Sequence, residues 1–394
     1  MKLYRNLSEA VVSILKTIFE DNQYADKVIE KTFKRNPKWG ARDRRFIAET
    51  TYDIVRWYRY LMAVSNSKNN DYWGLLGSWL IWKGIDLPVW DQFKNLNVVS
   101  IREGFQKEYP LSIKESIPDW LDELGNKELP SQWAKEIKSL NHEAEVVLRT
   151  NALKGGTGDI QKKLMEEGIE TTTNSKFPHA LLLTKRMNIF GSQSFRQGLF
   201  EMQDAGSQLI APFLRVEPGM RVIDACAGAG GKTLHLAALM QNKGRIVAMD
   251  TEGWKLDELR KRARRAGANN IETKIIENSK TIKRLSNSAD RLLLDVPCSG
   301  LGVLKRNPDA KWKLSPEYIS RVRSLQQQIL SEYTTMIKPG ALMVYSTCSI
   351  LPSENEEQVR QFLDSNPSFE LIEEKYCWPS EGFDGFYMAL IKKK

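Results

Sequence analysis

Two cysteines in the C-terminal half of the chain each stand beside serine and shortly after an apolar run. Cys298 lies in LLLDVPCSGLG, residues 292–302, and Cys348 lies in YSTCSILPSEN, residues 345–355. A buried structural thiol is the usual role of a cysteine. Two cysteines in such similar surroundings, with Asp295 three residues before the first, favour covalent chemistry instead, because a thiolate is a strong nucleophile. The residues alone leave open which cysteine is the nucleophile.

A glycine-rich turn, DACAGAGGKT (224–233), follows another apolar run and predicts a place where the backbone approaches a ligand. Three interpretations compete. Residues 231–233 match the second half of a nucleotide-binding P-loop, but Cys226 stands where its first glycine belongs. A dinucleotide fingerprint fits Gly228 and Gly230, but threonine replaces its third glycine. The third interpretation is a nucleoside cofactor without a pyrophosphate.

Asp250 ends the run RIVAMD (245–250), about twenty residues after the glycines. A carboxylate at this position can accept hydrogen bonds from both hydroxyls of a ribose. S-adenosylmethionine fits a site that binds a ribose and needs no phosphate loop. A methyl donor beside a cysteine has a chemical reason: carbon-5 of a pyrimidine becomes nucleophilic only after a thiolate adds to carbon-6. Asp295 is well placed to stabilise the charge that then develops near ring nitrogen-3.

Alternating strands and helices are predicted to place these residues at one edge of a sheet. Short apolar runs occur at 221–225, 245–250, 273–276, 291–295, 341–347 and 385–394, with helical stretches at 233–240, 253–267 and 315–337. This order is typical of a doubly wound, mostly parallel α/β sheet. Ligands bind at the carboxyl ends of the strands in such a sheet.

The rest of the chain predicts two further domains. Residues 1–118 show helical spacing of apolar residues without an intervening strand pattern, and we expect an all-α domain there. Residues 119–199 predict a small α/β domain that binds RNA, and residues 200–394 form the catalytic domain. Between residues 31 and 60, nine Lys/Arg and three acids alternate with aromatic residues, which indicates RNA binding or, equally, a solvated helix face over an aromatic core.

Composition is consistent with a globular enzyme that acts on a polyanion. The 394 residues carry a net charge of +9, with 41% hydrophobic and 27% charged residues. No apolar run is long enough to span a membrane, and the first residues do not resemble a signal peptide. The four cysteines form no C-x-x-C pair, so we expect neither a metal site nor disulfides, and a reducing cytoplasm as location. A monomer is expected.

The motifs in their order resemble those of the Sun-family RNA cytosine carbon-5 methyltransferases. The resemblance rests on DACAGAGGKT, PCSGLGVLKRNPDAKW and YSTCSILPSENEEQV, and is strong from residue 200 onward. It extends more loosely to residues 43–61, which are similar to a NusB-like helical RNA-binding domain. The resemblance implies a class I, Rossmann-like methyltransferase domain with an all-α NusB-like N-terminal domain and a small α/β subdomain between them.

The resemblance also implies a role for individual residues. Asp250 would bind the ribose of S-adenosylmethionine, and Asp295 would lie beside the methyl group and the target base. Cys348 would be the nucleophile, whereas Cys298 would act in release of the methylated product. Lys232 is expected to take part in both binding and catalysis. The loop that binds the cofactor comprises Cys226, Ala227, Gly228, Ala229, Gly230, Gly231 and Lys232.

Two positions depart from the family pattern. The family often reads A-A-P-G-G-K where this chain has residues 227–232, so the proline is missing and the turn should be looser. An acid usually follows the third strand and bonds the adenine amino group. Asn278 occupies the best-matching position here, with Glu277 beside it. An Asn carbonyl can still accept that hydrogen bond, so we include Asn278 in the expected cofactor site.

These observations predict methylation of carbon-5 of a cytosine in ribosomal RNA, in the small subunit, with S-adenosylmethionine as methyl donor. The NusB-like N-terminus favours ribosomal RNA. A transfer RNA methyltransferase with the same chemistry is the main alternative. A P-loop-like NTPase and an RNA-binding protein without activity are weaker alternatives, since both cysteines and Asp295 are present. The target base has to leave its stack to reach such a pocket.

Overall fold

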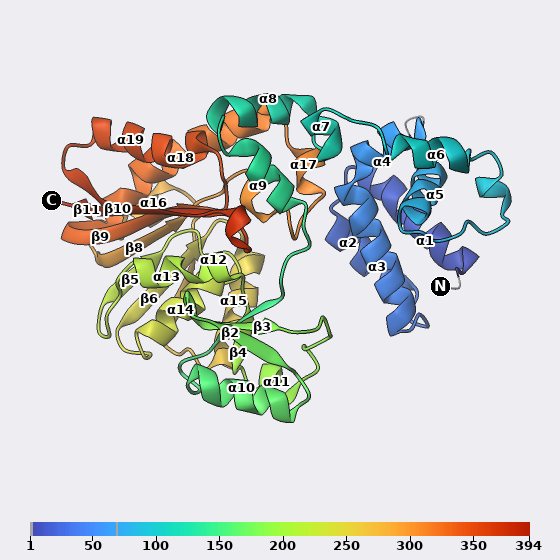
Figure 1. The fold of residues 1–394 in the computed structure, drawn as a ribbon. Coiled ribbons are helices and arrows are strands. Elements are labelled where there is room, and N and C mark those ends of the chain that lie inside the picture. Colours follow the sequence, from blue (N-terminus) through green and yellow to red (C-terminus); the bar gives the residue numbers. More distant parts are fainter. Residues whose placement is uncertain (1–2, 68–69) are drawn as a thin grey trace. The chain divides into compact units, whose positions relative to one another are not determined.

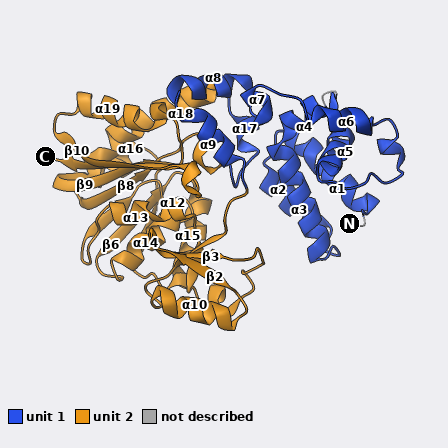
Figure 2. Cartoon of the chain, in the orientation of Figure 1, with its two compact units in different colours: residues 1–142, 304–315 blue, residues 143–303, 316–394 orange. Residues whose placement is uncertain are grey.

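The computed structural model describes residues 3–67 and 70–394, and its chain divides into two compact units (Figures 1 and 2). Unit 1 comprises residues 1–142 and 304–315, and unit 2 comprises residues 143–303 and 316–394. The domain boundaries predicted at 118/119 and 199/200 remain predictions. Within the described residues, no helix combines the length and the apolar character needed to cross a membrane.

Unit 1 is helical, as predicted. Its first helix shows why: Leu7, Val11, Ile14 and Ile18 recur every three or four residues and are all buried. The fifth helix is apolar on every side and is buried among the others. The helices are α1 (Arg5–Phe19), α2 (Ala25–Arg35), α3 (Ala41–Arg56), α4 (Tyr58–Ser65), α5 (Tyr72–Trp82), α6 (Val98–Gly104), α7 (Leu111–Lys114), α8 (Asp119–Glu128), α9 (Trp133–Leu140) and α17 (Ala310–Lys313).

Helix α17 reaches unit 1 from far along the sequence and is tied to it by hydrogen bonds. Trp312 Nε1 donates to Val55 O at 2.8 Å, and Asp309 Oδ2 accepts from the Ala25 amide at 2.9 Å. Lys311 is 1% exposed, and its ammonium donates to Arg56 O at 2.8 Å. The chain therefore leaves unit 2 after residue 303 and returns to it at residue 316.

Unit 2 contains a small antiparallel sheet in the order β2-β3-β1-β4. Helix α10 packs on this sheet, and Ile160 and Leu164 of that helix join its core. The small α/β element predicted before residue 200 is therefore present. Its elements are β1 (Val147–Thr150), α10 (Thr157–Glu166), β2 (Thr171–Asn174), β3 (Phe177–Leu183), α11 (Gln193–Arg196) and β4 (Phe200–Met202).

The second sheet of unit 2 is the predicted doubly wound sheet, in the order β10-β11-β9-β8-β5-β6-β7. Strands β9, β8, β5, β6 and β7 are parallel, whereas β11 runs antiparallel to both of its neighbours, β9 and β10. The strands are β5 (Arg221–Asp224), β6 (Arg245–Asp250), β7 (Ile271–Ile275), β8 (Ala289–Asp295), β9 (Ile337–Thr347), β10 (Phe369–Cys377) and β11 (Phe386–Lys393).

Helices cover both faces of this sheet (Figure 1). Neighbouring strand residues alternate between the two cores, so that Ile223 packs on one side and Val222 on the other. One layer contains α16 (Ser279–Lys283), α18 (Pro316–Tyr333) and α19 (Glu356–Ser365). The other layer contains α12 (Ala205–Gln208), α13 (Ile210–Phe213), α14 (Gly231–Leu239) and α15 (Gly253–Ala266).

The sequence analysis did not identify β10. This strand reads FELIEEKYC and is exposed along most of its length, with buried residues only at its two ends. It lies at the edge of the sheet, where one side has no neighbouring strand and charged residues are tolerated. An apolar pattern is therefore absent from its sequence. The missed strand lies away from the parallel strand ends that carry the predicted site.

Candidate active site

The carboxyl ends of β5, β6, β8 and β9 meet at one edge of the sheet and carry the predicted polar residues. Asp224 is the last residue of β5, Asp250 of β6 and Asp295 of β8. In the parallel register, Asp295 is paired with Ser346 of β9, two residues before Cys348. Residues far apart in the sequence are therefore brought together by strand order.

The glycine turn between β5 and α14 is built around backbone conformations that glycine adopts readily. Gly230 has φ +88°, and a Cβ on it would lie 2.5 Å from Leu259 Cγ, so this position requires glycine for both reasons. Gly228 has φ +54°, and its amide donates to Asp250 Oδ2 at 2.9 Å. The turn is thus held directly against the end of β6.

The Asp250 carboxylate is nearly buried and fixed by backbone donors. Its Oδ1 accepts from the Glu252 amide at 2.9 Å, while Oδ2 accepts from Gly228. Each carboxylate oxygen has two acceptor sites. Both oxygens of Asp250 therefore retain capacity for further donors, such as the hydroxyls of a ribose.

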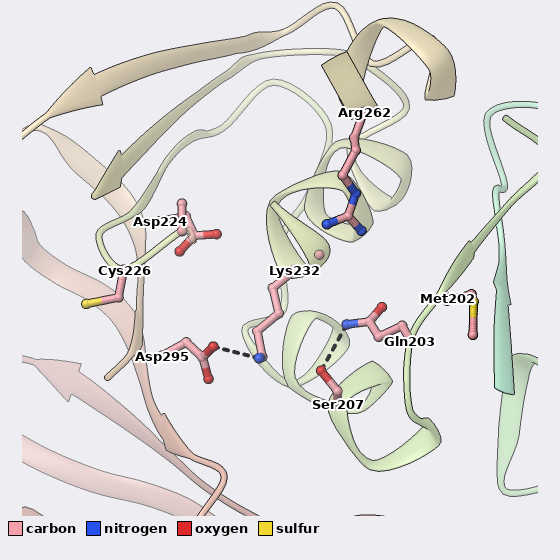
Figure 3. Close-up of a pocket in the computed structure, with 10 residues that line it drawn as sticks. Met202, Gln203, Ser207, Asp224, Cys226, Lys232, Arg262 and Asp295 are labelled. Atoms are coloured by element: carbon pink, nitrogen blue, oxygen red, sulfur yellow. Dashed lines mark hydrogen bonds and ion pairs between the residues drawn. The ribbon is translucent and has the colours of Figure 1, made fainter. Parts of the chain in front are cut away.

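Lys232 and Asp295 form an ion pair across the site (Figure 3). Lys232 Nζ donates to Asp295 Oδ2 at 2.6 Å, and Ser346 Oγ donates to Asp295 Oδ1 at 2.9 Å. Burial alone would lower the pKa of Lys232, but the charge and hydrogen bond of Asp295 outweigh it, and the nearby Cys348 adds to them, so the pKa is raised. The lysine therefore remains a cation at neutral pH.

Cys298 and Cys348 face each other, with their Sγ atoms 3.3 Å apart. This is a hydrogen-bond distance for sulfur. The hydrogen bond to Cys348, burial and the negative charge of Glu354 raise the pKa of Cys298 well above its usual value. Cys298 is therefore held as a thiol that can donate to Cys348 Sγ.

A small cavity lies beside the Lys232–Asp295 pair and the glycine turn (Figure 3). Burial raises the pKa of Asp224, one of its lining residues, to about 7, although a hydrogen bond from Thr233 opposes the shift. The pKa of Cys226 is also raised, by burial and by the charges of Asp224 and Asp295, which favours its thiol form. The cavity of about 180 Å³ is lined by Met202, Gln203, Ser207, Asp224, Cys226, Ala227, Gly231, Lys232, Arg262 and Asp295.

Two arginines hold carbonyls of the glycine turn. Arg262 of α15 donates from Nη1 to Ala229 O at 2.8 Å and also pairs with Glu201, at 3.0 Å from Nη2. Arg149 of β1 donates to the carbonyl of Gly231 and to Gln203. The turn lacks the family's proline, and these contacts show how it is ordered without that residue.

The predicted residues lie at or just beyond the carboxyl ends of neighbouring parallel strands. Residues 226–232, Asp250, Asp295, Cys298 and Cys348 all lie at the same sheet edge. Asn278 is exposed and begins α16, and its Oδ1 accepts from the Lys280 amide at 3.0 Å. Its side-chain oxygen thus already accepts one hydrogen bond from the first turn of α16. Its assignment to the cofactor site remains a prediction.

Sequence reasoning missed several residues that shape the site. Three of them are polar residues within or directly beside apolar or motif segments: Asp224, Arg149 and Glu354. A polar residue in such a segment is the sequence feature that could have identified them. Glu354 belongs to the PSEN stretch that was quoted only as part of a motif. The partners of these residues lie at distant positions, which a single sequence does not reveal.

Comparisons with known proteins agree with this geometry. A family model described as 16S rRNA methyltransferase RsmB/F matches residues 211–391, and one described as an RsmF/B-like ferredoxin-like domain matches residues 117–190. A probable ribosomal RNA small subunit methyltransferase B of Synechocystis sp. is 32% identical and aligns over 96% of this chain and 98% of its own length. The chain belongs to the RsmB/F methyltransferase family. The P-loop alternative is thereby removed.

Further proteins are similar to this RsmB/F-family chain over different shares of its length. The ribosomal RNA small subunit methyltransferase B of Pasteurella multocida is 34% identical, over 70% of this chain and 65% of that protein. A methyltransferase homolog from Pyrococcus horikoshii has a TM-score of 0.64 at 26% identity, over 72% of this chain and 98% of its own. The crystal structure of PH0851 has a TM-score of 0.83 at 23% identity and covers all of both chains, which shows a shared fold.

S-adenosylmethionine is the cofactor of this family, and the residues present suit it. Asp224 Oδ1 is buried and has no hydrogen-bond partner among the residues that the structure describes. An ammonium group, such as that of the cofactor's amino-acid end, could satisfy this oxygen. A Cβ on Gly228 would meet nothing within 4 Å, so the turn borders open space next to Asp250. The site thus offers acceptors at both ends of a nucleoside with an amino-acid tail.

Proposed function

We propose that this chain methylates carbon-5 of a cytosine in ribosomal RNA of the small subunit, through a covalent adduct with Cys348. The observation that carries the proposal is the 3.3 Å approach of Cys298 and Cys348 beside the ion pair of Lys232 and Asp295. The names of the relatives support ribosomal RNA as the substrate. We expect the enzyme to meet this RNA in the cytoplasm.

The first step is attack of Cys348 Sγ, as the thiolate after loss of its proton to solvent, on carbon-6 of the base. A sulfur–carbon bond forms, and the electron pair of the carbon-5–carbon-6 double bond moves into the ring. Nitrogen-3 then takes a proton from Asp295 Oδ2, which receives one in turn from Lys232 Nζ. Cys298 Sγ lies 3.3 Å from Cys348 Sγ, where its S–H can donate to the attacking sulfur.

Carbon-5 is now nucleophilic, and the bound S-adenosylmethionine supplies an electrophilic methyl group. Release requires removal of the carbon-5 proton. The electron pair of that carbon–hydrogen bond re-forms the double bond, and the bond between carbon-6 and Cys348 Sγ breaks. Cys298 gives its S–H proton to the departing sulfur and takes the carbon-5 proton, while nitrogen-3 returns its proton to the Asp295–Lys232 pair.

Nucleoside mass spectrometry tests the proposal. Ribosomal RNA from cells with and without the protein should differ in 5-methylcytidine, and purified protein with S-adenosylmethionine should restore the difference. If 5-methylcytidine changes in transfer RNA and not in ribosomal RNA, the substrate is wrong and the chemistry stands. If it changes in neither, the proposed activity is wrong.

A further inference from the structure

Glu354 is a buried carboxylate between the two cysteine-bearing turns. It is 0% exposed and belongs to a short turn, Pro352–Glu354, that follows β9. Its backbone is itself fixed, since Tyr345 Oη donates to its carbonyl at 2.7 Å. Burial of a carboxylate is costly unless hydrogen bonds compensate for the lost water. The groups that donate to Glu354 therefore indicate what this side chain does.

Four donors converge on this carboxylate. Ser299 donates twice, from its amide to Oε1 at 2.7 Å and from Oγ to Oε2 at 2.5 Å. Ser349 Oγ donates to Oε2 at 2.5 Å, and Gln326 Nε2 donates to Oε1 at 3.3 Å. Ser299 directly follows Cys298, and Ser349 directly follows Cys348. A single side chain thus connects the two turns that carry the reactive sulfurs.

The turn that carries Cys348 has supports that do not involve Glu354. The carbonyl of Cys348 accepts from the Gly302 amide at 2.9 Å. Ser349 is held on both sides, because its amide donates to Thr347 Oγ1 at 3.2 Å and its carbonyl accepts from Asn355 Nδ2 at 3.1 Å. Loss of Glu354 would leave these three hydrogen bonds in place.

The turn that carries Cys298 makes two hydrogen bonds to Glu354, both from Ser299, whereas the turn that carries Cys348 makes one, from Ser349. Both the amide and the hydroxyl of Ser299 donate to this one carboxylate. The neighbouring Pro297 carbonyl accepts from Gln326 Nε2 at 2.9 Å, and Gln326 also contacts Glu354. Without the carboxylate, the Ser299 amide would be a buried donor with no partner, and the turn would shift to satisfy it.

We propose that Glu354 is a positioning residue that holds Cys298 against Cys348 and thereby sets the rate of product release. This inference rests on the proposed function. It assigns release, and not formation of the adduct, as the step that depends on the Glu354 hydrogen bonds. Displacing a reacting group by about 1 Å can lower a rate by about a hundredfold, so a modest shift of Cys298 is sufficient.

Steady-state reactions of the full chain with S-adenosylmethionine and excess ribosomal RNA transcript test this inference. Glu354→Ala should raise the steady-state amount of denaturation-resistant protein–RNA adduct about fivefold and lower kcat about tenfold, with the KM for RNA and the affinity for S-adenosylmethionine within about twofold. Glu354→Gln should fall between Ala and wild type, because its amide oxygen can accept from the Ser299 amide and its NH2 can donate to the hydroxyls. Glu356→Gln, two residues further on, should match wild type.

A pair of serine variants keeps the inference testable if Glu354→Ala does not fold. Ser299→Ala should accumulate adduct, whereas Ser349→Ala should clear it at the wild-type rate. Equal behaviour of the two serine variants, or normal clearance by a folded Glu354→Ala protein that binds S-adenosylmethionine, would overturn the inference while leaving the proposed function intact. If wild-type protein yields neither adduct nor 5-methylcytidine, the proposed function fails and this inference fails with it.

Discussion

Lys232 Nζ lies 2.6 Å from Asp295 Oδ2, and this ion pair joins the end of the glycine turn to the end of β8. The lysine begins a helix next to the cofactor loop, and the aspartate ends a strand next to the cysteines. The pair therefore links the part of the site that binds the cofactor with the part that acts on the base. Its two members should contribute to rate more than to binding.

Lys232→Met should lower kcat about 10²–10³-fold with little change in the KM for RNA, since it removes the proton source beside nitrogen-3. The pKa of Lys232 is raised in the folded chain, so loss of its proton should not limit wild-type activity below about pH 10. Steady-state kinetics with a transcript would measure both. Lys338→Met is a matched control. Lys338 forms a similar ion pair, at 2.6 Å, with Asp290, which lies at the opposite end of β8 from Asp295.

The two cysteines should give opposite results in an adduct assay. Cys348→Ala should form no denaturation-resistant protein–RNA complex, because no sulfur can attack carbon-6. Cys298→Ala should accumulate the complex, because the departing sulfur has lost its proton donor. Gel analysis after denaturation distinguishes the two, with Cys377→Ala as a control that forms and clears adduct normally. The reverse pattern would exchange the roles of Cys298 and Cys348.

The sequence predicted the strand ends of the site because the signal is local there. Apolar runs that end on Asp250 or Asp295 indicate buried strands with a polar terminus, and parallel order then brings these termini to one edge. Which cysteine is the nucleophile could not be derived in this way. That assignment came from resemblance to the family and stays a prediction, because the 3.3 Å contact between the two sulfurs is symmetric with respect to the two roles.

The parts that escaped prediction depend on contacts between distant segments. Arg149 reaches the glycine turn from a strand 82 residues away, and Glu354 reaches Ser299 across 55 residues. Helix α17 follows the Cys298 motif directly in sequence yet belongs to the helical unit. The residue types in these segments do not indicate which distant residues they contact. Only the folded chain shows that a carboxylate in PSEN contacts both cysteine turns.

Arg262→Lys should weaken binding of S-adenosylmethionine about tenfold and leave the KM for RNA nearly unchanged. The guanidinium bonds Ala229 O and Glu201 at the same time, and a lysine ammonium does not reproduce that fork. Ala229 stands where the family often has proline, so the turn is less rigid by itself and should depend more on the Arg262 hydrogen bonds. Isothermal titration with the cofactor measures the change. Arg264→Lys, on the exposed part of the same helix, should bind as wild type does.

Asp224→Asn should stabilise the cofactor-free protein more at pH 8 than at pH 5. The pKa of Asp224 is raised from 3.8 to about 7 in the folded chain, so the folded state binds the extra proton between these values and stability falls as pH rises through the window. Asparagine does not ionise and avoids this loss, which amounts to roughly 2–4 kcal/mol in the free energy of unfolding. Thermal unfolding across this pH range measures it. Equal shifts at both pH values would contradict the prediction.

Lys311→Met should flatten the rise of stability with pH in unit 1. Burial and the charge of Arg56 lower the pKa of Lys311 well below 10.5, although Glu115 opposes the shift. The unfolded chain therefore binds the proton more readily between the folded pKa and 10.5, and wild-type stability increases with pH over that window.

The stability of unit 1 should therefore rise less between pH 7 and pH 10 in Lys311→Met than in wild-type protein. Hydrogen exchange of the α3 and α9 amides, expressed as protection factors, reports it for unit 1 within the full chain. The matched control is Lys16→Met, on an exposed face of α1, which should retain the wild-type pH dependence. If the stability of Lys311→Met changes with pH as steeply as that of the wild type, burial of Lys311 does not destabilise unit 1 and the prediction is wrong.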